Sequence, residues 1–123
     1  MGAGPDGRGF RAAGCPPAVF ALYSGYASDA SGPYDFTIGV QAPVDAPLPP
    51  GFYRRTVEAN RYARVVSGPG PAARVVFEAW QRVWSATDPE LGGRRAFRTD
   101  FERYPGAALS GGQEPVALFV GLM

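Results

Sequence analysis

Residues 71–86 read PAARVVFEAWQRVWSA, and they form the clearest helical pattern in the sequence. Pro71 suits the first turn of a helix, where a missing amide hydrogen costs nothing. Four large apolar side chains recur at helical spacing and therefore share one face: Val76, Trp80, Val83 and Trp84. We expect a helix over residues 72–86 whose apolar stripe packs against another element.

Strand patterns flank this helix on both sides. Residues 18–26 are dense in β-formers, and residues 34–40 alternate apolar and polar side chains after a turn, which predicts a hairpin. Residues 53–66, with a break at 59–60, also read as extended, as do two stretches after the helix: 96–104 and 116–122. The order strand, strand, loop, strand, helix, strand, strand predicts the α+β class, an antiparallel sheet packed by one main helix.

The chain has the length and composition of a single globular domain. It has 123 residues, of which 46% are hydrophobic and 19% are charged, close to the averages for folded proteins. Residues 1–17 are rich in Gly, Pro and Ala, so we expect a disordered tail there, followed by one domain over residues 18–123.

Composition excludes several classes of function. The chain has no histidine and one cysteine, Cys15, so a Ser-His-Asp triad, a zinc site and an internal disulfide are ruled out. We expect no metal and no cofactor. The net charge is +1 and the arginines are scattered, which argues against direct nucleic-acid binding. No leader-like or membrane-spanning apolar run is present, so we expect a cytoplasmic protein without membrane contact.

The segment DFERY at residues 100–104 carries the chemistry. On a strand, Glu102 and Tyr104 point to one face and Phe101 to the other. If the helix covers Phe101, then Glu102 lies among rings on the opposite, concave face. Burial disfavours a charged carboxylate, and a cationic ligand would offset that cost while each ring adds about 0.5–2 kcal/mol. The alternative is a surface strand on which Glu102 pairs with a nearby arginine.

Other aromatic residues extend this candidate ligand site. Tyr62 and Tyr104 are the better tyrosine candidates and Tyr26 the next. The alternative for Tyr23, Tyr26, Tyr34 and Tyr62 is that they fill a sheet face. Trp80 and Trp84 are further ligand-binding candidates, with core packing as the alternative.

Six segments, in this order, carry a resemblance: YSGYASD at 23–29, GPYDFTIG at 32–39, PGF at 50–52, ANRYA at 59–63, AWQRVW at 79–84 and RAFRTDFERY at 95–104. Over residues 18–122 the chain resembles the GyrI-like effector-binding domain of bacterial transcription activators, especially its integron-cassette-associated branch. The resemblance implies a duplicated β-α-β-β (effector-binding, SOUL-like) fold, with a ligand groove between its halves. The glutamate on the floor of that groove matches Glu102 by motif.

The resemblance also implies a partial first repeat. Only the Gly- and Pro-rich stretch stands where the family has its first strand and first helix. The result is a sheet edge and an apolar face left uncovered. Either the start codon is assigned too late, or a second copy of the chain completes the fold as a homodimer, and we expect the protein to dimerise or to be poorly soluble.

Three functions follow as hypotheses. The first is binding of small amphipathic or cationic aromatic ligands, for drug or effector sensing or sequestration, with a link to transcriptional regulation. The second is a small hydrolase of electrophilic natural products in which Glu102 acts as acid or base and Tyr104 or Tyr62 assists. The third is a protein-interaction module of the gyrase-inhibitor kind.

Overall fold

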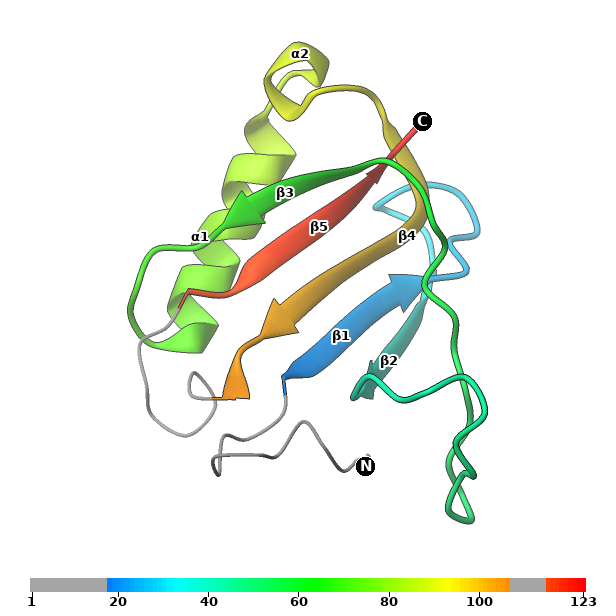
Figure 1. Ribbon diagram of the computed structural model, residues 1–123. Helices are drawn as coiled ribbons and strands as arrows, with labels where there is room; N and C mark the ends of the chain where they lie inside the picture. The colour runs from blue at the N-terminus through cyan, green and yellow to red at the C-terminus, as the bar shows by residue number, and fades with distance from the viewer. Residues whose placement is uncertain (1–17, 107–114) are drawn as a thin grey trace.

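The computed structural model describes residues 18–106 and 115–123, so the tail expected at 1–17 lies outside the described residues. The described residues form an α+β domain, as the sequence predicts (Figure 1). In chain order the elements are β1 (Val19–Ser24), β2 (Asp35–Gly39), β3 (Tyr62–Val66), α1 (Ala72–Ser85), α2 (Asp88–Leu91), β4 (Arg95–Tyr104) and β5 (Ala117–Leu122).

The five strands make one antiparallel sheet in the order β2-β1-β4-β5-β3. Its register sets which side chains share a face. Ala21 on β1 lies opposite both Ile38 on β2 and Glu102 on β4, and Tyr23 lies opposite Phe36. Because side chains alternate along a strand, these residues all point to one side of the sheet.

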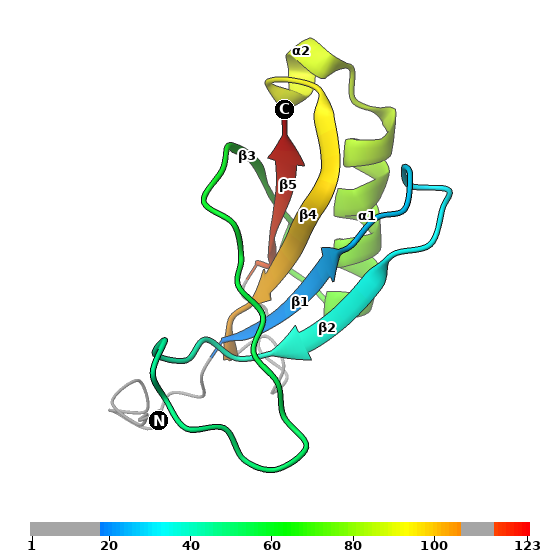
Figure 2. The ribbon, with the colours of Figure 1, turned by 90° about the vertical axis from the view of Figure 1, so that its right-hand side faces the viewer.

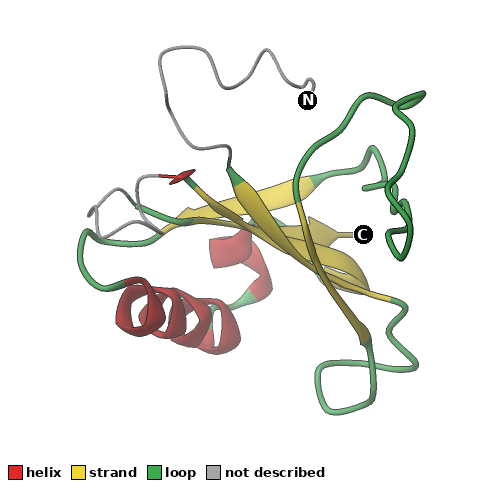
Figure 3. Ribbon diagram, turned by 90° about the horizontal axis from the view of Figure 1, so that it is seen from below, coloured by secondary structure: helices red, strands yellow, loops and turns green. Residues whose placement is uncertain are grey.

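Helix α1 lies on that same side, over the half of the sheet made by β3, β5 and β4 (Figures 2 and 3). The apolar stripe predicted from its spacing packs into the core, with Trp84 as the exception. The core cluster of buried residues is Val76, Ala79, Trp80, Val83, Val116, Leu118 and Val120. The other half of this side, over β1 and β2, has no helix above it in the part of the chain that the structure describes.

A second aromatic layer covers the side of the sheet away from α1. Phe101 stacks on Phe119 with ring centroids 4.6 Å apart, and Phe20 and Tyr62 lie 6.1 and 5.4 Å from the Phe101 ring. The expectation that the helix covers Phe101 is therefore wrong: Glu102 faces the helix and Phe101 faces away. The physical reason is Trp80, whose buried indole N–H needs an acceptor that Glu102 supplies.

Two local expectations also change. Residues 53–58 are not a strand but part of an exposed connection that crosses the side of the sheet away from α1 (Figure 2). Their sequence, YRRTVE, lacks the apolar alternation that would anchor an added strand. The short helix α2 was not expected, although the Thr87 side chain and Glu90 form a capping box that is a known signal for a helix start.

Strand β4 contains an irregularity that changes which way its first residues point. Phe97 has φ of 53°, a left-handed conformation that is rare for a large side chain, and the pairing with β5 shifts between Arg95 and Asp100. Residues five apart on a regular strand point to opposite faces. Here Arg95 nevertheless reaches Asp100, because the irregularity turns its side chain to the same face.

Within the described ranges, no helix combines the length and apolar character that crossing a membrane requires.

Candidate ligand-binding groove

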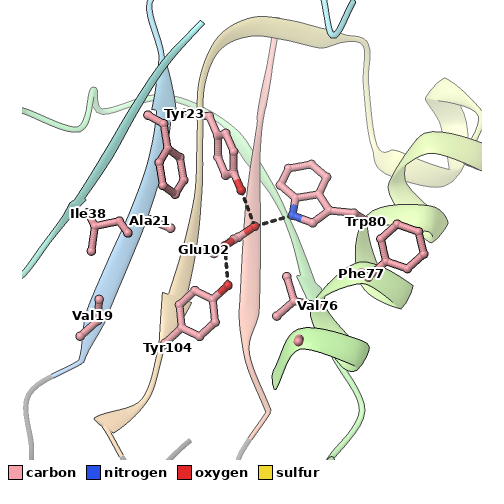
Figure 4. A pocket seen from close by; sticks show the side chains of 11 residues that line it. Val19, Ala21, Tyr23, Ile38, Val76, Phe77, Trp80, Glu102 and Tyr104 are labelled. Atoms are coloured by element: carbon pink, nitrogen blue, oxygen red, sulfur yellow. Dashed lines mark hydrogen bonds between the residues drawn. The ribbon is translucent and has the colours of Figure 1, made fainter. Parts of the chain in front are cut away.

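A groove of about 610 Å³ lies between α1 and the bare half of the sheet. Its size falls within the range of roughly 300–1,000 Å³ that is usual for small-molecule sites. Figure 4 shows Glu102 on the floor, β1 on one side and α1 on the other. The lining side chains are mostly apolar or aromatic: Val19, Ala21, Tyr23, Phe36, Ile38, Ala73, Val76, Phe77, Trp80, Glu102 and Tyr104.

The Glu102 carboxylate is the charged group of this groove, and its residue is only 3% exposed. The Trp80 indole N–H donates to Oε2 at 2.5 Å, and the Tyr23 hydroxyl donates to the same oxygen at 2.9 Å. The Tyr104 hydroxyl donates to Oε1 at 2.6 Å. These bonds give each carboxylate oxygen at least one donor and hold the group in place (Figure 4).

All three of these donors are neutral, so the charge of Glu102 has no counterion in the described part of the chain. The ion pairs found there join other residues: Arg74 with Glu78, Arg95 with Asp100, and Arg98 with Glu58. The alternative of a surface glutamate paired with an arginine is thus not what the structure shows. A buried, hydrogen-bonded anion without a cation remains electrostatically attractive to one.

The surroundings of Glu102 keep the phenols protonated. Burial raises the pKa of Tyr23 and of Tyr104, and the charge of Glu102 and its hydrogen bonds raise both further. Burial and a hydrogen bond to Asp100 raise the pKa of Tyr26 in the same direction. The two groove tyrosines therefore act as neutral donors and cannot serve as anionic bases near neutral pH.

These shifts predict that the three tyrosines ionise only as the protein unfolds in alkali. A free tyrosine ionises at about pH 10, and the folded state binds the proton of these three tyrosines more tightly. Their contribution to the free energy of unfolding is therefore complete below that pH and is lost as the pH rises further. The part of the tyrosinate absorbance that comes from these three residues should change together with the circular dichroism over that range. Tyr104→Phe should remove one tyrosine from the coincident change. Ionisation of Tyr104 in the wild-type protein at a lower pH than the change in circular dichroism would contradict the prediction.

A row of rings extends from the floor to the outer face of α1. Tyr23 meets Trp80 edge to face at 5.8 Å, and Trp84 stacks on Trp80 at 6.2 Å. Phe77 and Trp84 are each 56% exposed, so the helix side of the groove presents aromatic surface to solvent. These rings give a ligand several faces on which to stack.

The structure brings together only part of the residue set expected from the sequence. Glu102, Tyr104 and Trp80 meet at one point, and Trp84 adjoins them without lining the groove. Tyr62 lies on the other side of the sheet and donates to the carbonyl of Glu58 at 2.8 Å. Tyr26 lies outside the groove and donates to Asp100 at 2.6 Å.

Sequence reasoning ranked Tyr23 below Tyr62, yet Tyr23 is the second phenol on Glu102. A signal for it exists in the alternation of Val19, Ala21 and Tyr23, which continues the apolar side of the neighbouring hairpin strand.

A second hollow of about 520 Å³ lies on the opposite side of the sheet, under the connection from β2 to β3. Three arginines and two acids line it: Arg54, Arg55, Arg98, Asp35 and Glu58. Its charged lining residues are exposed and of both signs, so it lacks the buried, uncompensated charge that marks the groove. Within the described residues, no three His, Cys, Asp or Glu side chains gather in a way that could hold a metal ion.

Comparison with known proteins gives two matches. A family model described as "Integron-associated effector binding protein" matches residues 13–120. A Bacillus subtilis (strain 168) protein named as a proposed transcriptional regulator, YobU, is 31% identical over 104 residues. That alignment covers 85% of this chain and 63% of YobU, so the chain spans less than two thirds of this relative's length.

Proposed function

Because the chain belongs to the integron-associated effector binding protein family, we propose that it binds an organic cation bearing an aromatic ring in the groove above Glu102. The observation that carries this proposal is a carboxylate 3% exposed whose three partners are all uncharged. A cationic ligand supplies the missing counterion and gains more in this low-dielectric place than in water.

The stereochemistry of Glu102 leaves room for such a ligand. Oε2 accepts from Trp80 and Tyr23, whereas Oε1 accepts from Tyr104 alone. A carboxylate offers about four lone-pair sites, so Oε1 can accept one more donor or lie against a quaternary ammonium. The rings of Tyr23 and Trp80 stand beside it, and cation–π attraction there adds roughly 0.5–2 kcal/mol per ring.

The test compares two probes that have the same shape and differ in charge: benzyltrimethylammonium and neopentylbenzene. We expect the cation to bind at least about 10-fold more tightly, which corresponds to about 1.4 kcal/mol. Quenching of tryptophan fluorescence measures both affinities, and the shift of the Trp80 indole N–H resonance places the probe in the groove. Equal affinity for the two probes would contradict a cation site.

Effector binding is linked by this proposal to transcriptional regulation. The relative YobU is named as a proposed transcriptional regulator, and the family description refers to effector binding. We therefore propose that the bound cation is a regulatory signal and that it is not turned over. The second possibility, sequestration of a toxic cation, uses the same groove and differs in having no downstream partner.

The same geometry weighs against the hydrolase alternative. The Glu102 carboxylate already accepts three hydrogen bonds from side chains of the protein, which hold it in one orientation. Tyr104 and Tyr23 hold their protons firmly, as their raised pKa values indicate. This arrangement suits electrostatic binding better than proton transfer.

A further inference from the structure

Two buried carboxylates lie two residues apart on the same face of β4, and they differ in one respect. Asp100 is fully buried and Glu102 is 3% exposed. Asp100 accepts from Arg95 at 2.7 Å, from the Tyr26 hydroxyl at 2.6 Å and from the Gly121 amide at 2.8 Å. Asp100 therefore has a cationic partner, whereas every partner of Glu102 is neutral.

Arg95 lies close to the groove without entering its lining. Its guanidinium carbon is 4.3 Å from the centroid of the Phe97 ring and 5.9 Å from that of Trp80. Trp80 is the residue whose indole N–H bonds to Glu102. The cation of Arg95 and the anion of Glu102 thus both adjoin the Trp80 indole, the first over its ring and the second at its N–H.

The guanidinium also has unused bonding capacity. Its Nη2 bonds to Asp100, but its Nε is buried and has no hydrogen-bond partner. A buried donor without a partner is costly, so the group gains from any acceptor that it can reach. The ion pair with Asp100 holds the Arg95 guanidinium in its position.

The irregularity at Phe97 makes this anchoring geometrically feasible. Arg95 and Asp100 are five residues apart and would point to opposite faces of a regular strand. The left-handed backbone at Phe97, with φ of 53°, brings both to the groove face. A strained residue of this kind persists only where the surrounding structure holds it, and here the Phe97 ring packs against Arg95.

We propose that Asp100 is a specificity-determining residue that holds Arg95 away from Glu102 and so keeps the groove carboxylate free for a cationic ligand. Without Asp100, the Arg95 guanidinium pairs with Glu102 and neutralises the groove from within. This inference rests on the proposed function for its meaning, but its structural content can be tested without a ligand.

The binding test uses Asp100→Asn and the double variant Arg95→Met/Asp100→Asn. Asparagine keeps an acceptor for the Gly121 amide while losing the charge that holds Arg95. We expect Asp100→Asn to lower the affinity for benzyltrimethylammonium about 10-fold or more and to leave the affinity for neopentylbenzene unchanged. The double variant should recover the wild-type affinity for the cation, which a merely structural role of Asp100 would not produce.

A ligand-free test measures whether Arg95 and Glu102 interact after Asp100 is neutralised. Glu102→Gln should lower the urea midpoint of Asp100→Asn by more than it lowers that of Arg95→Met/Asp100→Asn, because only the former contains the new ion pair. In the wild-type background, Glu102→Gln should lower the urea midpoint by nearly the same amount with and without Arg95→Met. This cycle decides the inference even if wild-type protein fails to bind the cation, a failure that overturns the proposed function alone.

Three results would overturn the inference. One is full cation affinity in Asp100→Asn. Another is an Asp100→Asn protein that unfolds while the double variant folds, since the freed guanidinium would then have found no partner at Glu102. The third is unfolding of both variants, which would show that Asp100 serves the fold itself.

Discussion

Glu102→Gln is expected to lower the affinity for benzyltrimethylammonium about 10- to 100-fold and to leave the affinity for neopentylbenzene nearly unchanged. The substitution keeps the size and planarity of the side chain and removes its charge. Hydrogen bonds and contacts that involve a charged group are worth about 1.5–3 kcal/mol, and about 1.4 kcal/mol corresponds to a tenfold change in affinity. The loss of affinity should therefore be seen for the cation and not for its neutral isostere.

Glu58→Gln is the matched control for this measurement. Glu58 is an exposed carboxylate on the connection between β2 and β3, paired with Arg98 at 3.0 Å on the far side of the sheet. Its neutralisation changes the net charge of the protein by the same amount and leaves the groove untouched. Similar losses in both variants would mean that the cation responds to overall charge, and the role of Glu102 would then fail.

Gly121→Ala is expected to lower the free energy of unfolding through overpacking of the sheet, by an amount near the upper end of roughly 1–3 kcal/mol. A Cβ at this position would lie 2.5 Å from the backbone oxygen of Thr99, which is a backbone atom and cannot rotate away. The shift that relieves this contact also disturbs the Gly121 amide bonded to Asp100. Urea unfolding followed by circular dichroism measures the loss.

Gly39→Ala separates this steric effect from the general effect of adding a methyl group. Gly39 is also a strand glycine, but a Cβ there meets nothing within 4 Å. Because glycine is less favourable than alanine inside a strand, we expect this variant to be neutral or slightly stabilised, by about 0.5–1 kcal/mol at most. Equal destabilisation of the two variants would contradict the close approach of β4 and β5.

Local patterns predicted the elements of the fold because each pattern has a direct physical cause. The three- and four-residue spacing of Val76, Trp80 and Val83 gave the bounds of α1 to within one residue and also its buried side. Alternation gave the hairpin of β1 and β2. The α+β class, inferred from the order of strands and helix, is confirmed. The membership in an effector-binding family, inferred from six short segments, is also confirmed.

Alternation could not tell which side of the sheet the helix covers. It showed that Glu102 and Phe101 point to opposite sides, and the choice between them needed a partner for the buried Trp80 indole N–H. The side on which Tyr62 lies could not be predicted either, since it depends on the register of β3 against β5, which places Ala63 opposite the buried Val120. The turn at Phe97 left no trace in the sequence, because no glycine marks its left-handed backbone.

The expected disordered tail, the homodimer and the cytoplasmic location stay predictions. The structure does show the surface on which the homodimer expectation rested. Phe36 and Ile38 on the edge strand β2 are 51% and 65% exposed, and they form the outer wall of the groove.

The charge of the groove and its walls stand on different parts of the sheet. Glu102 lies on β4, the middle strand, whereas one wall lies on the edge strand β2 and the other on α1, above the far half. A change in the twist of the sheet would therefore move the two walls more than it would move the carboxylate. If the groove binds cations as proposed, cations of different thickness are expected to compete with one another for it.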